Sequence, residues 1–110
     1  MPKITDHELV NGLVVGTEEG RIDWQLTGSA GQFTASFGGK WTLLFTQRVT
    51  SDREIVPVLE VQNSEGETLL RLTRFQDDRI PDLYETARRR ALKIDEALAD
   101  LLKEINSPQK

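Results

Sequence analysis

Cysteine is absent from this 110-residue sequence, and histidine occurs only once. Without cysteine the chain has no disulfide, no thiolate nucleophile and no thiolate metal ligand, and one histidine excludes zinc sites built from several histidines. Long apolar runs are missing too, since no window reaches the roughly 18 apolar residues of a membrane span. The first ten residues lack the basic and then apolar layout of a signal peptide. We therefore expect a cytoplasmic protein that does not enter a membrane.

Basic residues are outnumbered by acidic ones, 14 to 18, which gives a formal net charge of −4. A chain of this sign lacks the wide positive surface that binds nucleic acid, so nucleic acid is an unlikely partner unless the contact is local. The apolar fraction of 37% suffices for a modest core. The length predicts a single domain over residues 1–110.

Catalytic and cofactor motifs are also missing. The sequence contains no G-x-S-x-G nucleophile elbow, no dinucleotide fingerprint and no H-E-x-x-H zinc motif. The Gly-Lys pair in "FGGKWT" does not belong to a phosphate loop, because Trp41 follows Lys40 where Ser or Thr is needed. We expect no enzyme activity, no catalytic residue, no cofactor and no metal site.

A helix is predicted near the N-terminus, over about residues 5–18. Thr5 is placed as its N-cap and Glu8, three residues on, as the second half of a capping box. His7 then lies in an exposed first turn, which explains it better than an acid–base role does. Gly12 and Gly16 oppose the helix, and "LVNGLV" can also be interpreted as a hairpin.

Alternation of apolar and polar residues predicts five strands, over about residues 21–27, 32–38, 41–49, 54–62 and 67–74. Short turn sequences separate them, which is typical of an antiparallel meander. The side chains expected on its apolar face from the first three strands are Ile22, Trp24, Leu26, Phe33, Ala35, Phe37, Trp41, Leu43 and Phe45.

One long helix is predicted over about residues 80–105, with apolar residues spaced by three and four from Tyr84 to Ile105. The fold class is therefore α+β: an N-terminal helix, a five-stranded antiparallel meander, and a long C-terminal helix packed on the sheet. This order of elements is similar to that of many small bacterial proteins, and the similarity assigns no residue a role.

The distal half of the long helix carries the strongest functional indication. From Pro81 to Ile105 the helix would run roughly 37 Å, whereas the outer strands of a five-stranded sheet lie only about 19 Å apart. The apolar side chains that extend beyond the sheet are Ile94, Leu98, Leu101, Leu102 and Ile105. The N-terminal helix, a second copy of the chain or another protein must cover them. We interpret the chain as a protein–protein interaction module, of adaptor, inhibitor or immunity type, which binds a partner protein or itself as a homodimer.

Two other interpretations remain open. The adjacent cations Arg89, Arg90 and Lys93 are a candidate contact for an anion or an RNA phosphate, although charged residues on a helix are usually only its solvated face. Alternatively, sheet and helix enclose an apolar ligand cavity. Its expected lining is Trp24, Trp41, Tyr84, Ala87 and Ala91.

Overall fold

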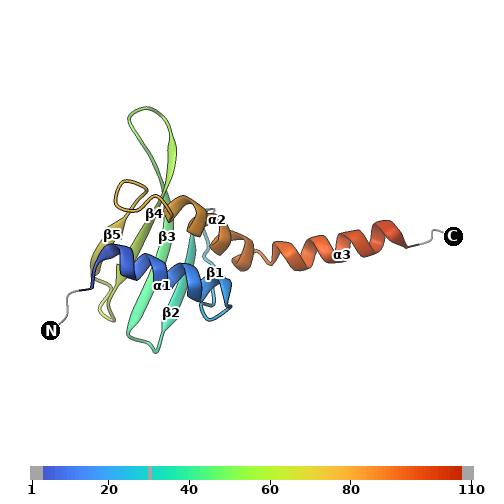
Figure 1. Cartoon of the computed structure of the whole chain (residues 1–110), viewed down its shortest axis with the longest axis horizontal. Coiled ribbons are helices and arrows are strands. Elements are labelled where there is room, and N and C mark those ends of the chain that lie inside the picture. Colours follow the sequence, from blue (N-terminus) through green and yellow to red (C-terminus); the bar gives the residue numbers. More distant parts are fainter. Residues whose placement is uncertain (1–3, 30, 108–110) are drawn as a thin grey trace.

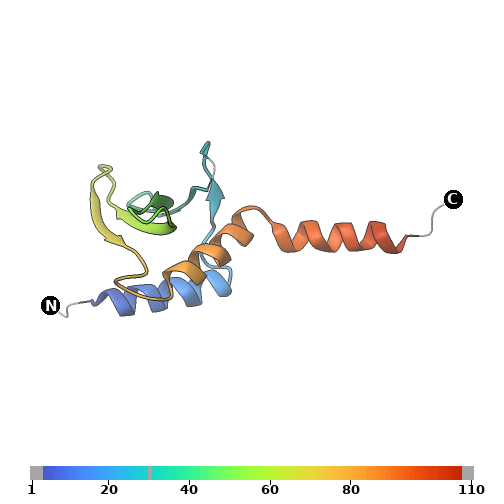
Figure 2. The same cartoon turned by 90° about the horizontal axis from the view of Figure 1, so that it is seen from above.

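Five antiparallel strands form one sheet in the order β1-β2-β3-β4-β5. The computed structural model describes residues 4–29 and 31–107. Its elements are α1 (Asp6–Glu18), β1 (Gln25–Leu26), β2 (Phe33–Phe37), β3 (Trp41–Val49), β4 (Ile55–Gln62), β5 (Thr68–Leu72), α2 (Ile80–Ala91) and α3 (Ile94–Asn106). Helices α1 and α2 lie side by side along one face of the curved sheet, whereas α3 extends away from it (Figures 1 and 2). The predicted α+β class and antiparallel meander are confirmed.

Helix α1 begins as its capping residues predict, because the Glu8 backbone N–H donates to Thr5 Oγ1 at 3.1 Å. The hairpin interpretation of this segment is wrong. Gly16 is tolerated because it is buried against Ile22, whose Cδ1 atom would lie 3.1 Å from a Cβ added at Gly16. The missing side chain lets the chain after α1 pack closely against the helix.

Gly12 is expected to be a weak point of α1 that alanine repairs. Apart from its chain neighbours and the backbone of α1 itself, no atom lies within 4 Å of a Cβ added there, and the residue is an exposed helix interior position. We expect Gly12→Ala to raise the free energy of unfolding by about 0.5–1 kcal/mol, through helix propensity and lower unfolded-state entropy. Gly16→Ala is the matched control and should not stabilise, because Ile22 must move. Equal stabilisation in urea titrations of both variants would contradict this account.

The first strand is shorter than predicted and covers two residues, Gln25–Leu26, instead of 21–27. The chain before it is held to α1: Arg21 N–H donates to Gly16 O at 2.8 Å, and Trp24 Nε1 donates to the buried Thr17 Oγ1 at 3.0 Å. These bonds draw the segment toward the helix and away from the sheet ladder. Ile22 and Trp24 are buried as predicted, but beneath helices rather than within a strand.

The core lies between the sheet and helices α1 and α2. Phe45 is at its centre, with ring centroids of Trp24 and Tyr84 each 5.4 Å away. Burial raises the pKa of Tyr84, whose hydroxyl donates to Gly31 O at 3.0 Å. Of the side chains expected on this face, Leu26, Phe37 and Trp41 are exposed, the last by 46%. Phe37 and Trp41 are paired at the end of the β2–β3 hairpin, beyond the core cluster.

Arg79, immediately before α2, fastens this helix to α1. Its guanidinium donates two hydrogen bonds to the buried Asp77 carboxylate, at 3.0 and 2.8 Å. It also donates to the His7 carbonyl at 3.0 Å and to Asn11 Oδ1 at 3.3 Å, both on α1. The hydrogen bonds from Arg79 hold the pKa of Asp77 at about 2, against the desolvation that burial causes. We call Asp77 and Arg79 with their α1 contacts the helix clamp. The acidic residues before α2 therefore include a buried structural carboxylate.

The C-terminal segment forms two helices, so the expected continuous helix over 80–105 is wrong. Helix α2 ends at Ala91, and Lys93 adopts a left-handed conformation with φ 54° before α3 begins. Arg88, Arg89 and Arg90 occupy the last turn of α2, and Asp95 and Glu96 the first turn of α3. Cations at a helix C-terminus and anions at a helix N-terminus stabilise the two ends, so the charge order favours a break here.

Candidate interaction surface

Helix α3 buries none of its residues against the rest of the described chain. Its side chains Leu98, Leu101, Leu102 and Ile105 are 51%, 54%, 57% and 67% exposed, and Ile94 is partly exposed. We call these five residues the α3 stripe. The expectation that this set extends beyond the sheet is confirmed, and the alternative in which the N-terminal helix covers it is wrong. Four of the five stripe residues are thus open to solvent and Ile94 is only partly so. They lie on a helix that extends from the body (Figure 1).

The stripe has the spacing of a helix-pairing surface. Ile94, Leu98, Leu101 and Ile105 are separated by four, three and four residues, which places them along one line of a 3.5-residue repeat. Leu102 lies beside that line. The helix has 13 residues and is therefore about 20 Å long. It presents almost two heptads of apolar surface.

The polar side of α3 is acidic. The helix carries Asp95, Glu96, Asp100 and Glu104 and a single cation, Lys103. Two acids lie in the first turn and Lys103 lies in the last, which suits the helix dipole. A partner that approaches the stripe therefore meets an apolar line with mostly negative edges.

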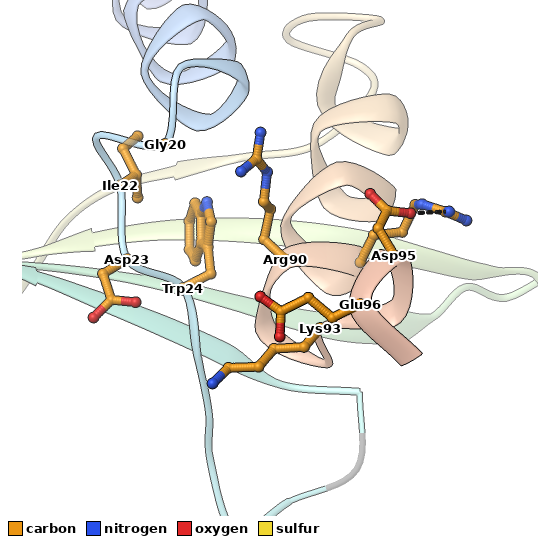
Figure 3. A pocket seen from close by; sticks show the side chains of 9 residues that line it. Gly20, Ile22, Asp23, Trp24, Arg90, Lys93, Asp95 and Glu96 are labelled. Carbon is orange, nitrogen blue, oxygen red and sulfur yellow. Dashed lines mark hydrogen bonds and ion pairs between the residues drawn. The ribbon is translucent and has the colours of Figure 1, made fainter. Parts of the chain in front are cut away.

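A cleft of about 430 Å³ opens where α2 meets α3 (Figure 3). It is lined by Gly20, Ile22, Asp23, Trp24, Arg89, Arg90, Lys93, Asp95 and Glu96. Arg89 forms an ion pair with Asp95 across the break, and Arg90 donates to the Glu18 carbonyl of α1 at 2.8 Å. In a continuous helix Arg89 and Asp95, six residues apart, would not share a face, so this ion pair depends on the break.

The three candidate anion contacts thus come together at one cleft, but two of them already have partners in the chain. Arg89 is neutralised by Asp95, and the Arg90 guanidinium caps the end of α1. Three acids, Asp23, Asp95 and Glu96, line the same cleft. The cleft therefore carries balanced charge, which does not favour an anion or an RNA phosphate.

The five residues expected around a ligand cavity do not meet at one. Trp24, Tyr84 and Ala87 belong to the packed core cluster, and Ala91 packs against it. Trp41 lies at the β2–β3 hairpin, outside that cluster. In the described ranges, no three histidine, aspartate or glutamate side chains converge as metal ligands.

Another pair of exposed apolar side chains lies on the β3–β4 hairpin, where Val49 and Ile55 are directly opposed. They are the last pair of the ladder before the turn. Two aliphatic side chains make a smaller apolar surface than the five of the α3 stripe. The stripe is accordingly the stronger candidate surface.

Within residues 4–29 and 31–107, none of the helices combines the length and the apolar character that crossing a bilayer needs. Fold and surface together define a small α+β protein whose sheet and first two helices form a packed body and whose last helix is an exposed, acidic, amphipathic arm. Comparisons of the chain with protein-family models, curated proteins and solved structures find no match.

Proposed function

We propose that the chain is a non-enzymatic protein–protein interaction module, of adaptor, inhibitor or immunity type, that binds its partner through the α3 stripe. The observation that carries the proposal is the exposure of the stripe: four of its five side chains are more than half open to solvent. Contiguous apolar surface of this kind usually marks an interaction site. The cytoplasmic location and the lack of catalytic activity are proposed from the sequence, which has one histidine and no cysteine.

The spacing of the stripe supports helix-mediated binding in particular. Leu98, Leu101, Leu102 and Ile105 follow the i, i+3, i+4, i+7 pattern by which amphipathic helices bind apolar surfaces. Because α3 contributes nothing to the core, its apolar residues can be devoted to a partner without loss of stability. The sheet with α1 and α2 then serves to hold α3 in an exposed position.

Capture from lysate of the host tests the proposal, with the tagged full-length chain as bait and half of each sample treated with nuclease. The decisive comparison is with Leu98→Ala/Leu101→Ala, which removes the centre of the stripe and keeps helix propensity. We expect a stoichiometric protein partner, or the chain itself, that survives nuclease and is lost at least tenfold in the double variant.

Asp100→Ala is the matched control, because it changes a polar residue of the same helix that lies off the stripe. It should retain the partner. If the double variant captures the same proteins as the unaltered chain, the stripe is not the binding surface. Recovery of nucleic acid alone, lost in nuclease, would instead favour Arg89, Arg90 and Lys93.

A further inference from the structure

We propose that the partner of the α3 stripe is the α3 stripe of a second copy, paired antiparallel about a two-fold axis; this inference rests on the proposed function. The reason is that four of the five stripe residues form a line with the same sequence and spacing in both directions. Its main line is Ile94, Leu98, Leu101, Ile105, in which both the spacing (four, three, four) and the residue types (Ile, Leu, Leu, Ile) are palindromic. Reversal therefore superposes the line on itself.

Antiparallel pairing produces four complete apolar layers. Ile94 of each copy meets Ile105 of the other, and Leu98 of each copy meets Leu101 of the other. A two-fold interface requires such self-complementarity, since each contact must occur twice. Shifting the register by one heptad would leave half of these side chains without an apolar partner.

The charges at the edges of the pair are compatible with this orientation. In heptad geometry Asp95 lies opposite Leu102 of the second copy, and Glu104 lies opposite Ala97, so no two acids are directly opposed. The positive N-terminal end of each α3 also lies beside the negative C-terminal end of the other.

The shape of the molecule favours the same orientation. The body lies at the N-terminal end of α3, and α3 extends along the longest dimension of a molecule measuring 65 × 37 × 25 Å (Figures 1 and 2). An antiparallel pair places the two bodies at opposite ends. A parallel pair would bring both bodies to one end of two helices whose axes are only about 8–10 Å apart.

The contact is small, so the dimer should depend strongly on concentration. Two helices about 20 Å long bury less than the roughly 1,600 Å² of a standard protein interface. We expect self-association in the micromolar range or weaker. Sedimentation equilibrium should therefore extend from about 1 μM to about 1 mM.

The absence of cysteine allows a direct test of pairing and orientation. Ile94→Cys and Ile105→Cys are made separately in full-length chains that carry tags of different size, and they are oxidised alone and mixed. Because disulfides form between Cα atoms less than about 7 Å apart, an antiparallel pair predicts a cross-linked heterodimer in the mixture only. In each single variant the engineered thiols would be about 16 Å apart.

Each outcome decides the proposal. Cross-linking in the mixture, with dimerisation weakened at least tenfold by Leu98→Ala/Leu101→Ala and unaffected by Asp100→Ala, supports it. Efficient cross-linking of each single variant alone would show a parallel pair and overturn it. A chain that is monomeric to about 1 mM but still captures a host protein through the stripe overturns the second copy and leaves the proposed function standing. A monomeric chain that captures nothing overturns both.

Discussion

Truncation of Leu59 to alanine is expected to lower the free energy of unfolding by about 2–5 kcal/mol, whereas the same truncation at Leu101 should change it by less than about 0.5 kcal/mol. Leu59 lies in β4 with none of its surface exposed, and its removal leaves a cavity among core side chains. Leu101 is 54% exposed on α3 and packs against no core residue. The same substitution is thus expected to destabilise the fold when it is made in the core and to leave stability nearly unchanged when it is made in α3.

Urea titrations at about 1 μM protein, below the expected range of self-association, give the two values for the monomer. Titrations of the unaltered chain and of Leu101→Ala at higher protein concentration add a second readout. If α3 pairs with a second copy, the unaltered chain gains stability as its concentration rises, and Leu101→Ala loses that gain. A loss above about 1 kcal/mol for Leu101→Ala in the dilute monomer would show that α3 packs on its own body, which contradicts the exposed stripe.

The sheet was the most predictable part of the fold, because strand alternation is a local signal. Phe33, Ala35, Leu43 and Phe45 were assigned to the apolar face from alternation alone, and all four are buried. The assignment failed at Leu26, Phe37 and Trp41, which are exposed. Alternation shows which face of a strand a residue occupies, but not how far the helices extend over that face.

The break between α2 and α3 was missed because the apolar spacing continues through it. Ala91 and Ile94, on either side of the junction, are three residues apart, as in a continuous helix. Neither Gly nor Pro marks the junction. The available signal was electrostatic, since three arginines followed by Asp95 and Glu96 suit a helix end and a new helix start. The residues of the α3 stripe could be predicted from the sequence, because their spacing is the same whether or not the helix breaks before Ile94.

The helix clamp could not be predicted, since it depends on a contact between residues 72 positions apart, Arg79 and His7. In the sequence Asp77 is one of several acids before a helix, a pattern that helix-start electrostatics explains without burial. In the folded chain Asp77 is buried, with His7 Nδ1, on α1, 3.6 Å from its Oδ2 atom. Because this carboxylate is ionised in the folded chain, the stability of the fold is expected to depend on pH.

Asp77→Asn is expected to lower the free energy of unfolding at neutral pH by about 1.5–3 kcal/mol, the range for hydrogen bonds to a charged group. The substitution keeps the size of the side chain but removes the carboxylate that accepts two hydrogen bonds from the Arg79 guanidinium and one from the Arg79 backbone N–H. Glu54→Gln is the control. It removes an ion pair with Arg74 whose two side chains are both exposed, and should cost less than about 1 kcal/mol.

The effect of Asp77→Asn should disappear in acid. The pKa of Asp77 falls from 3.8 to about 2 on folding, chiefly because Arg79 hydrogen bonds to the ionised carboxylate, with a smaller electrostatic contribution from His7. A lowered folded-state pKa means that the contribution is fully present above about pH 4 and is lost as the pH falls through about 2. Denaturation of both proteins from neutral pH down to pH 2 should therefore show their stabilities converging over this window. A difference that stays constant would mean that the clamp acts through its shape and neutral hydrogen bonds, not through the charge of Asp77.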